Sequence, residues 1–122
     1  MDIEKVVKQL KVKYPGKNIF LDDKDGYQEI ICEVDPTSDH PDFSTAVVVV
    51  GKGRAHFHKY TKEIYEVIRG RLCVYLKGEK NMLKKGEKIK IPLNTLHYPE
   101  GDETWFYTYS TPGWTPEDHI LV

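Results

Sequence analysis

The sequence predicts an all-β domain with a short α-helix at its N-terminus. Two observations predict this class. One segment near the N-terminus has the apolar spacing of a helix, and the remainder consists of short strand candidates separated by turn signals. No long helical segment interrupts these strands, which disfavours a parallel α/β sheet and favours an antiparallel sandwich or barrel.

The helix is predicted over residues 2–13. Its apolar residues follow the i, i+3, i+4, i+7 spacing of a single helix face: Ile3, Val6, Val7 and Leu10. A Pro-Gly pair that begins at Pro15 follows directly and ends the helical pattern.

Eight strands are predicted beyond the helix. Turn signals such as Asp25-Gly26 separate them. A chain of 122 residues is too short for two ordinary domains. We therefore expect one domain with a helix over about 1–14, a β-barrel over about 28–110 and a C-terminal tail over 111–122. The strand candidates are 28–34, 44–50, 54–58, 63–69, 71–77, 81–84, 87–91 and 104–110.

The composition argues against several classes of partner. The formal net charge is -1, and the basic residues are interleaved with acidic ones, which disfavours nucleic acid. The longest apolar runs, such as 46–50, are far shorter than the about 20 residues that a membrane-spanning helix needs. The first residues lack the layout of a secretory signal, so we expect a cytoplasmic protein. Cys32 and Cys73 lie in separate strand-like segments, which favours buried, reduced thiols.

Three histidines and one glutamate have the spacing of a metal site. His56 and His58 are two residues apart, so on a strand both imidazoles point to the same face, about 7 Å apart along the backbone. A short polar connection then returns the chain to Glu63, whose carboxylate would face the two histidines. His97 follows a strand and a turn and would complete a set of three nitrogens and one oxygen.

Around these residues the sequence resembles the cupin superfamily. The first cupin motif is matched by Gly51, the His56-Phe57-His58 triplet, Glu63 and Gly70. The second motif is matched by Gly86, Pro92 and His97. The departures lie outside the four ligand positions: Gly51 is one residue too close to His56, Asn94 replaces a turn glycine, and Gly101 replaces an asparagine.

The resemblance spans about residues 44–110 and implies a double-stranded β-helix, a jelly-roll barrel, with the metal inside one end. It implies one divalent ion per chain held by His56, His58, Glu63 and His97. The ion is Zn, Fe, Mn, Ni or Co, because imidazole and carboxylate ligands suit all five. The alternative is a barrel that has lost its metal. Asn tolerates a positive φ, so we expect Asn94 to keep the turn that presents His97.

Two further residues are candidates for contact with a substrate. Arg54 has the parity of His56 and would hold a carboxylate or phosphate, or else lie in solvent at the barrel rim. Tyr65 has the parity of Glu63 and would bind substrate or transfer a proton, or else serve as a core aromatic. Glu66 has the opposite parity and should face outward. His40 and His119 lie outside both motifs and are expected in solvent or as capping residues.

Three functions remain open. The leading hypothesis is a metal-dependent isomerase or epimerase that acts on a sugar or sugar phosphate, in which Tyr65 is the one inward candidate for proton transfer. An Fe(II)-dependent dioxygenase would use the same ligands. A non-catalytic barrel would bind a small ligand or a metal without turnover. The resemblance and the apolar residues 120–122 also predict a homodimer.

Overall fold

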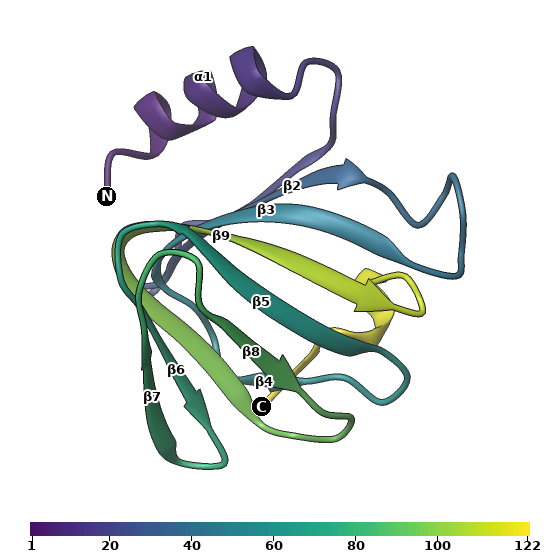
Figure 1. The fold of residues 1–122 in the computed structure, drawn as a ribbon. Helices are drawn as coiled ribbons and strands as arrows, with labels where there is room; N and C mark the ends of the chain where they lie inside the picture. The colour runs from purple at the N-terminus through teal and green to yellow at the C-terminus, as the bar shows by residue number, and fades with distance from the viewer.

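The computed structural model describes residues 1–122 as one α-helix, a short 3-10 helix and a curled sheet of ten strands (Figure 1). The strands pair antiparallel throughout. The predicted all-β architecture with an N-terminal helix is confirmed. In chain order the elements are α1 (Ile3–Lys13), β1 (Ile19–Asp22), β2 (Gln28–Asp35), β3 (Ser44–Lys52), β4 (His56–Phe57), β5 (Lys62–Arg69), β6 (Leu72–Leu76), β7 (Glu79–Leu83), β8 (Lys88–Ile91), β9 (His97–Thr111), η1 (Pro116–Asp118) and β10 (Ile120–Leu121).

Two predicted strands need correction, and two strands were not predicted. The predicted strand 54–58 shortens to the two residues of β4, because the chain leaves the ladder at Gly53, whose N–H donates to Pro99 O at 2.8 Å. β9 begins at His97 instead of residue 104, since the stretch around Pro99 pairs with β6 despite its turn-type residues. The prediction misses β1 and β10, which are four and two residues long and carry too little alternation to be recognised.

The helix begins and packs as its sequence predicts. The carboxylate of Asp2 accepts a hydrogen bond from Lys5 N–H at 3.1 Å and so caps the first turn. Val6 and Leu10 on the predicted apolar face are 0% exposed. α1 lies over β2 and β3 in Figure 1, so the helix covers the outer face of the sheet.

β9 connects the two halves of the curled sheet. Its first part, His97 to Gly101, pairs with β6, and its second part pairs with β3 and β5. The strand bends between them, where Glu103 has a φ of 54°. At this bend a Cβ added to Gly101 would collide with the side chain of Thr104, so the position requires glycine.

Two hydrophobic clusters lie on opposite faces of the sheet. The inner cluster fills the barrel and consists of Val48, Val50, Tyr65, Val67, Leu72, Val74, Leu83, Ile91 and Phe106. The outer cluster lies under α1 and consists of Val6, Leu10, Ile30, Cys32, Val47, Val49 and Trp105. Successive residues on β2 and β3 point to opposite faces of the sheet, so they pack alternately into the inner and the outer cluster. Cys32 and Cys73 are buried and free, as predicted.

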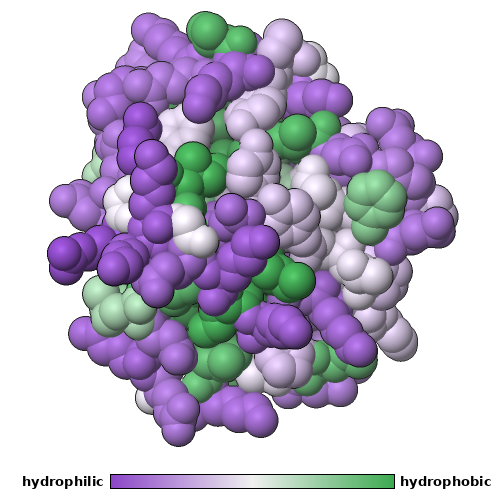
Figure 2. Space-filling view, viewed as in Figure 1, coloured by the Kyte–Doolittle hydropathy of each residue, from purple (hydrophilic) through white to green (hydrophobic).

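The C-terminal segment folds back onto the barrel. β10 pairs with β4, with Ile120 opposite Phe57 and Leu121 opposite His56. Leu121 and Val122 remain exposed, and the homodimer stays a prediction. In the view of Figure 2 hydrophilic residues cover most of the face, and hydrophobic residues emerge between them in separate groups. α1 is 11 residues long, and no helix has the length and apolar character to cross a membrane.

Candidate metal centre

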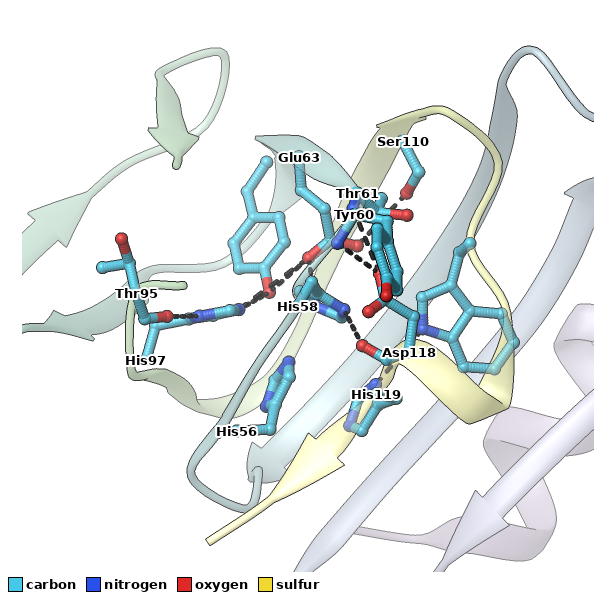
Figure 3. A network of polar contacts seen from close by, with 12 residues as sticks. His56, His58, Tyr60, Thr61, Glu63, Thr95, His97, Ser110, Asp118 and His119 are labelled. Carbon is cyan, nitrogen blue, oxygen red and sulfur yellow. Dashed lines mark hydrogen bonds and ion pairs between the residues drawn. The ribbon is translucent and has the colours of Figure 1, made fainter. Parts of the chain in front are cut away.

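The four predicted ligands come together at one end of the barrel. His56 lies on β4 directly opposite His97 on β9, His58 lies in the loop after β4, and Glu63 lies on β5. Each offers a ligand atom, and these atoms lie within 4.8 Å of one another. All four side chains are buried, at 1–5% exposure (Figure 3). The sequence spacing therefore predicted a real cluster.

Backbone carbonyls set the tautomer of the three histidines. Nδ1 of His56, His58 and His97 lies 2.8 Å from the carbonyl oxygens of residues 54, 118 and 95, respectively. A carbonyl oxygen only accepts, so each Nδ1 carries the hydrogen. Each Nε2 is then left with its lone pair free to bind a metal, as in metal-binding histidines generally.

The contact between His58 and Glu63 shows that the cluster fits a cation. His58 Nε2 lies 2.9 Å from Glu63 Oε1, yet it is buried and has no hydrogen-bond partner. With the hydrogen on Nδ1, two acceptor atoms face each other, which is stable only when a proton or a metal ion lies between them. His97 Nε2 lies 3.8 Å from the same oxygen.

The charges in the cluster favour an ionised carboxylate. Burial alone would raise the pKa of Glu63, but the hydrogen bonds and charges of His58 and His97 lower the pKa below its usual range. Burial, followed by the nearby His119 and His97, holds the pKa of His56 well below its ordinary value. Burial opposes a charge on His58, but the contact with Glu63 raises the pKa of His58 above its ordinary value. A divalent metal bound at the cluster would displace the proton that His58 and Glu63 share.

The turn before His97 has the predicted conformation. Asn94 has a φ of 53°, which confirms that it replaces the turn glycine of the family motif. Its N–H donates to His58 O at 2.8 Å. This hydrogen bond ties the turn that presents His97 to the loop that carries His58.

Tyr65 points inward, as its parity predicts, and contacts two ligands. Its hydroxyl donates either to His97 Nε2 at 3.1 Å or to Glu63 Oε1 at 3.5 Å. Ser110 donates to the second carboxylate oxygen of Glu63 at 3.1 Å. Burial, followed by the charges of Glu63 and Glu29, raises the pKa of Tyr65 well above its usual value. Tyr65 is therefore a hydrogen-bond donor at neutral pH and a poor base.

His119 caps the C-terminus of η1, as one of the two expectations had it, but its side chain also lies against the cluster, which the sequence did not predict. Its ring stacks on the ring of His56, with centroids 3.9 Å apart and planes inclined by 11°. Trp114 Nε1 donates to His119 Nδ1 at 3.2 Å, so the hydrogen of the neutral ring lies on Nε2. Burial is the main cause that lowers its pKa to about 4. His119 adds an N–H donor beside the cluster.

Asp118 orients His58 from the same C-terminal segment. Its carboxylate accepts hydrogen bonds from the backbone N–H groups of residues 59, 60 and 61 at 2.8–3.1 Å. Its carbonyl oxygen is the partner of His58 Nδ1. Asp118 is buried, and it holds both the loop and the imidazole in place (Figure 3). No local sequence signal marks this role.

Arg54 is bound to acidic residues of the neighbouring loop. Its Nε and Nη2 donate to the two carboxylate oxygens of Asp22 at 2.6 and 3.2 Å, and Asp25 lies 3.6 Å away. The guanidinium also stacks over the ring of Tyr27. The role of Arg54 in substrate binding stays a prediction.

A cavity of two adjoining chambers leads to the cluster. The inner chamber has a volume of about 30 Å³ and reaches His56, Glu63 and Tyr65. The outer chamber has a volume of about 210 Å³ and opens between β1 and the C-terminal segment. The two chambers share the lining residues Ile31, Trp114 and His119.

Solved structures of known proteins share this architecture. A Streptomyces protein, Pac13, described as a nucleoside dehydratase, superposes with a TM-score of 0.75 at 20% identity, over 89% of this chain and 87% of that one. KdgF from Halomonas sp. has a TM-score of 0.62 at 26% identity, over 78% and 87%. A cupin-like protein from Thermotoga maritima has a TM-score of 0.66 at 20% identity, over 75% and 76%.

No protein-family model and no curated protein sequence matches the chain, so the likeness lies in the structure. The solved structures match most of the curled antiparallel sheet, and the buried histidine and glutamate cluster fits a metal-binding cupin. The cupin barrel predicted from the two motifs is confirmed. The chain has the cupin fold.

Proposed function

We propose that the protein is a metal-dependent enzyme that isomerises or epimerises a small oxygenated molecule, a sugar or a sugar phosphate. The observation that carries this proposal is the facing pair of His58 Nε2 and Glu63 Oε1, 2.9 Å apart, where a cation is needed. Glu63 also lines the cavity through which a small molecule would enter. When bound, a divalent ion supplies a Lewis acid that polarises a carbonyl or hydroxyl oxygen.

Glu29 is the side chain best suited to move a proton. It lies on the inward face of β2, lines the outer chamber, and makes no hydrogen bond or ion pair with the protein. Burial, followed by the negative charges of Asp22 and Glu63, raises its pKa to about 7. A carboxyl group with this pKa takes up and releases protons at neutral pH. Glu29 thus supplies the base that Tyr65 does not.

Tyr65 and His119 complete the set of polar groups. The hydroxyl of Tyr65 lies within hydrogen-bond distance of His97 and donates to an oxygen that develops negative charge. His119 presents an N–H at the junction of the two chambers. Two donors and one base around an oxygen-bearing carbon are what an isomerisation through proton transfer requires.

The structural neighbours support chemistry of this kind. Pac13 is described as a nucleoside dehydratase, and another cupin-fold neighbour is the ectoine synthase of P. lautus, with a TM-score of 0.65 at 19% identity. Loss of water next to a carbonyl begins with removal of a proton, as isomerisation does. The description of Pac13 as a dehydratase therefore favours proton-transfer chemistry for this chain as well.

Metal analysis followed by solvent exchange tests the proposal. The purified protein should contain, or take up, one divalent ion per chain. The loaded protein should incorporate deuterium from D₂O at the carbon next to the carbonyl of an aldose or ketose, as measured by NMR. Glu29→Gln should abolish exchange and keep the ion, whereas Glu79→Gln, which changes an exposed carboxylate on β7, should alter neither.

Other outcomes would point to other functions. Failure to bind any metal would overturn the proposal. Oxygen consumption by the iron-loaded protein would favour a dioxygenase, and full metal occupancy without turnover would favour a binding barrel. We also propose a cytoplasmic homodimer, for which sedimentation at micromolar concentration is the test. A monomer would contradict it.

A further inference from the structure

We infer that the cavity admits uncharged, hydroxyl-bearing molecules and excludes phosphate and carboxylate ligands. This inference rests on the proposed function, because it narrows the substrate from a sugar or sugar phosphate to an unphosphorylated sugar. Three observations support it: the lining is acidic, the nearest cation, Arg54, is already paired with Asp22, and the outer chamber has an apolar wall.

The lining of the two chambers is acidic. It contains two histidines but no lysine or arginine. Glu33 and Glu63 line the inner chamber, and Asp22 and Glu29 line the outer one. A divalent ion in the cluster would offset two of these four negative charges, and Arg54 offsets the charge of Asp22. Glu33, together with Glu29 whenever it is ionised, then leaves the lining without net positive charge, and a phosphate would meet carboxylates in a partly desolvated space.

The cation nearest to the lining is already paired with carboxylates. Arg54 is the basic residue that contacts this lining, and its Nε and Nη2 donors are taken by Asp22 and by Lys24 O. His119 accepts a hydrogen bond at Nδ1 and is therefore a neutral ring. Proteins that bind phosphate use unpaired Arg, Lys or helix N-termini, and the cavity offers none of these.

Glu29 is a carboxylate of the outer chamber that has no partner in the protein. It lies opposite Asp22 in the register of β1 and β2, and Arg54 pairs with Asp22 and Asp25 but not with Glu29. A Cβ added at Gly53 would lie 3.0 Å from Glu29 Oε2 and 2.7 Å from Pro99 Cδ, so the absence of a side chain at Gly53 leaves room for the carboxylate. An unpaired carboxylate accepts hydrogen bonds from hydroxyl groups and repels anions.

The outer chamber also has an apolar wall. Phe20 and Trp114 meet edge to face with centroids 5.5 Å apart, and Leu21 and Leu121 lie beside them. An aromatic wall packs against the carbon-bound hydrogens of a ring, while carboxylates at the opposite side accept its hydroxyl groups. The combination suits an uncharged sugar ring.

A first test measures phosphate binding at the metal. Wild-type protein and the Glu29→Gln/Glu33→Gln variant are loaded with Co(II) and titrated with inorganic phosphate at constant ionic strength, and the visible spectrum is recorded. We expect the variant to bind phosphate at least tenfold more tightly than the wild type. Glu79→Gln is the matched control and should behave as the wild type. Equal affinity in all three proteins, or equal absence of binding, would overturn the inference.

A second test needs no metal and separates failure of the inference from failure of the proposed function. Trp114 is partly exposed at the chamber wall, whereas Trp105 is 4% exposed, so soluble quenchers report on Trp114. Caesium and acrylamide should quench its fluorescence several-fold better than iodide, and the Glu29→Gln/Glu33→Gln variant should lose this preference. Efficient iodide quenching of the wild type would contradict an acidic cavity. Failure to load Co(II) would contradict only the proposed metal centre.

Discussion

The inner and outer hydrophobic clusters have the same kind of residues but differ in their connection to the metal centre. In the inner cluster, Tyr65 packs on Phe106 at a centroid distance of 4.8 Å and also contacts His97. In the outer cluster, the residues under α1 pack only against one another and the back of the sheet. A substitution in the outer cluster should therefore lower stability without changing the metal centre. A substitution in the inner cluster should change both.

The largest expected effect comes from the outer cluster. Leu10→Ala removes a fully buried side chain beneath α1 and should lower the free energy of unfolding by about 2–5 kcal/mol. Urea denaturation measures this loss, and the metal content per folded chain should stay unchanged. Leu72→Ala, at an equally buried position of the inner cluster, should lower the free energy of unfolding by a comparable amount and should also lower the metal content per folded chain. A lower metal content in Leu10→Ala would show that the outer cluster is also connected to the metal centre.

The second effect concerns the metal alone. His58→Ala removes one imidazole ligand and should lower metal content at least tenfold, while the fold stays largely intact because both clusters are unchanged. Elemental analysis and circular dichroism measure the two properties. His40→Ala, a change outside the cluster, is the control. If His58→Ala unfolds and keeps its dependence on metal, the histidine has a structural role instead.

A smaller effect is expected at Asp118, which positions His58 without binding the ion. Asp118→Ala removes three hydrogen bonds to the loop 59–61 and should weaken metal binding by about tenfold. Isothermal titration with zinc gives the affinity. Because the carbonyl of residue 118 remains, the ion should still bind. An unchanged affinity would show that the loop holds its shape without the carboxylate.

The smallest effect is a pH dependence outside both clusters. A hydrogen bond to Asp35 at 2.6 Å is the main cause that raises the pKa of His40. The stabilisation is fully present below the pKa of the unfolded chain and is lost as pH rises through the higher pKa of the folded protein. NMR titration should show the raised pKa, and Asp35→Asn should return it toward the ordinary value. Metal content should not follow this titration.

The features that the sequence predicted correctly are those set by residues close together in the chain. The helix follows from four apolar residues at helical spacing, and the pair His56 and His58 follows from the two-residue period of a strand. Asn94 is a third case, because its positive φ is a property of a single turn. These features need no knowledge of what packs against them.

The missed residues depend on packing between distant segments. Asp118 and His119 reach the cluster because β10 pairs with β4, some sixty residues earlier in the chain. Glu29 was missed because α1 covers the outer face of β2. Ile30 and Cys32 therefore pack under the helix, and Glu29 and Glu33 point into the barrel. Alternation along β2 is visible in the sequence, but it does not tell which face is inside.

The dependence of His58 on Asp118 has a consequence for synthesis. In the order of the chain, His56, His58, Glu63 and His97 all precede Asp118, so the four candidate ligands exist before the residue that orients His58. The imidazoles are then free to rotate, and an ion that arrives early meets ligands without a fixed geometry. Only when the segment after β9 pairs with β4 does His58 take its final orientation. The final geometry of the candidate ligands therefore depends on the last segment of the barrel to pair.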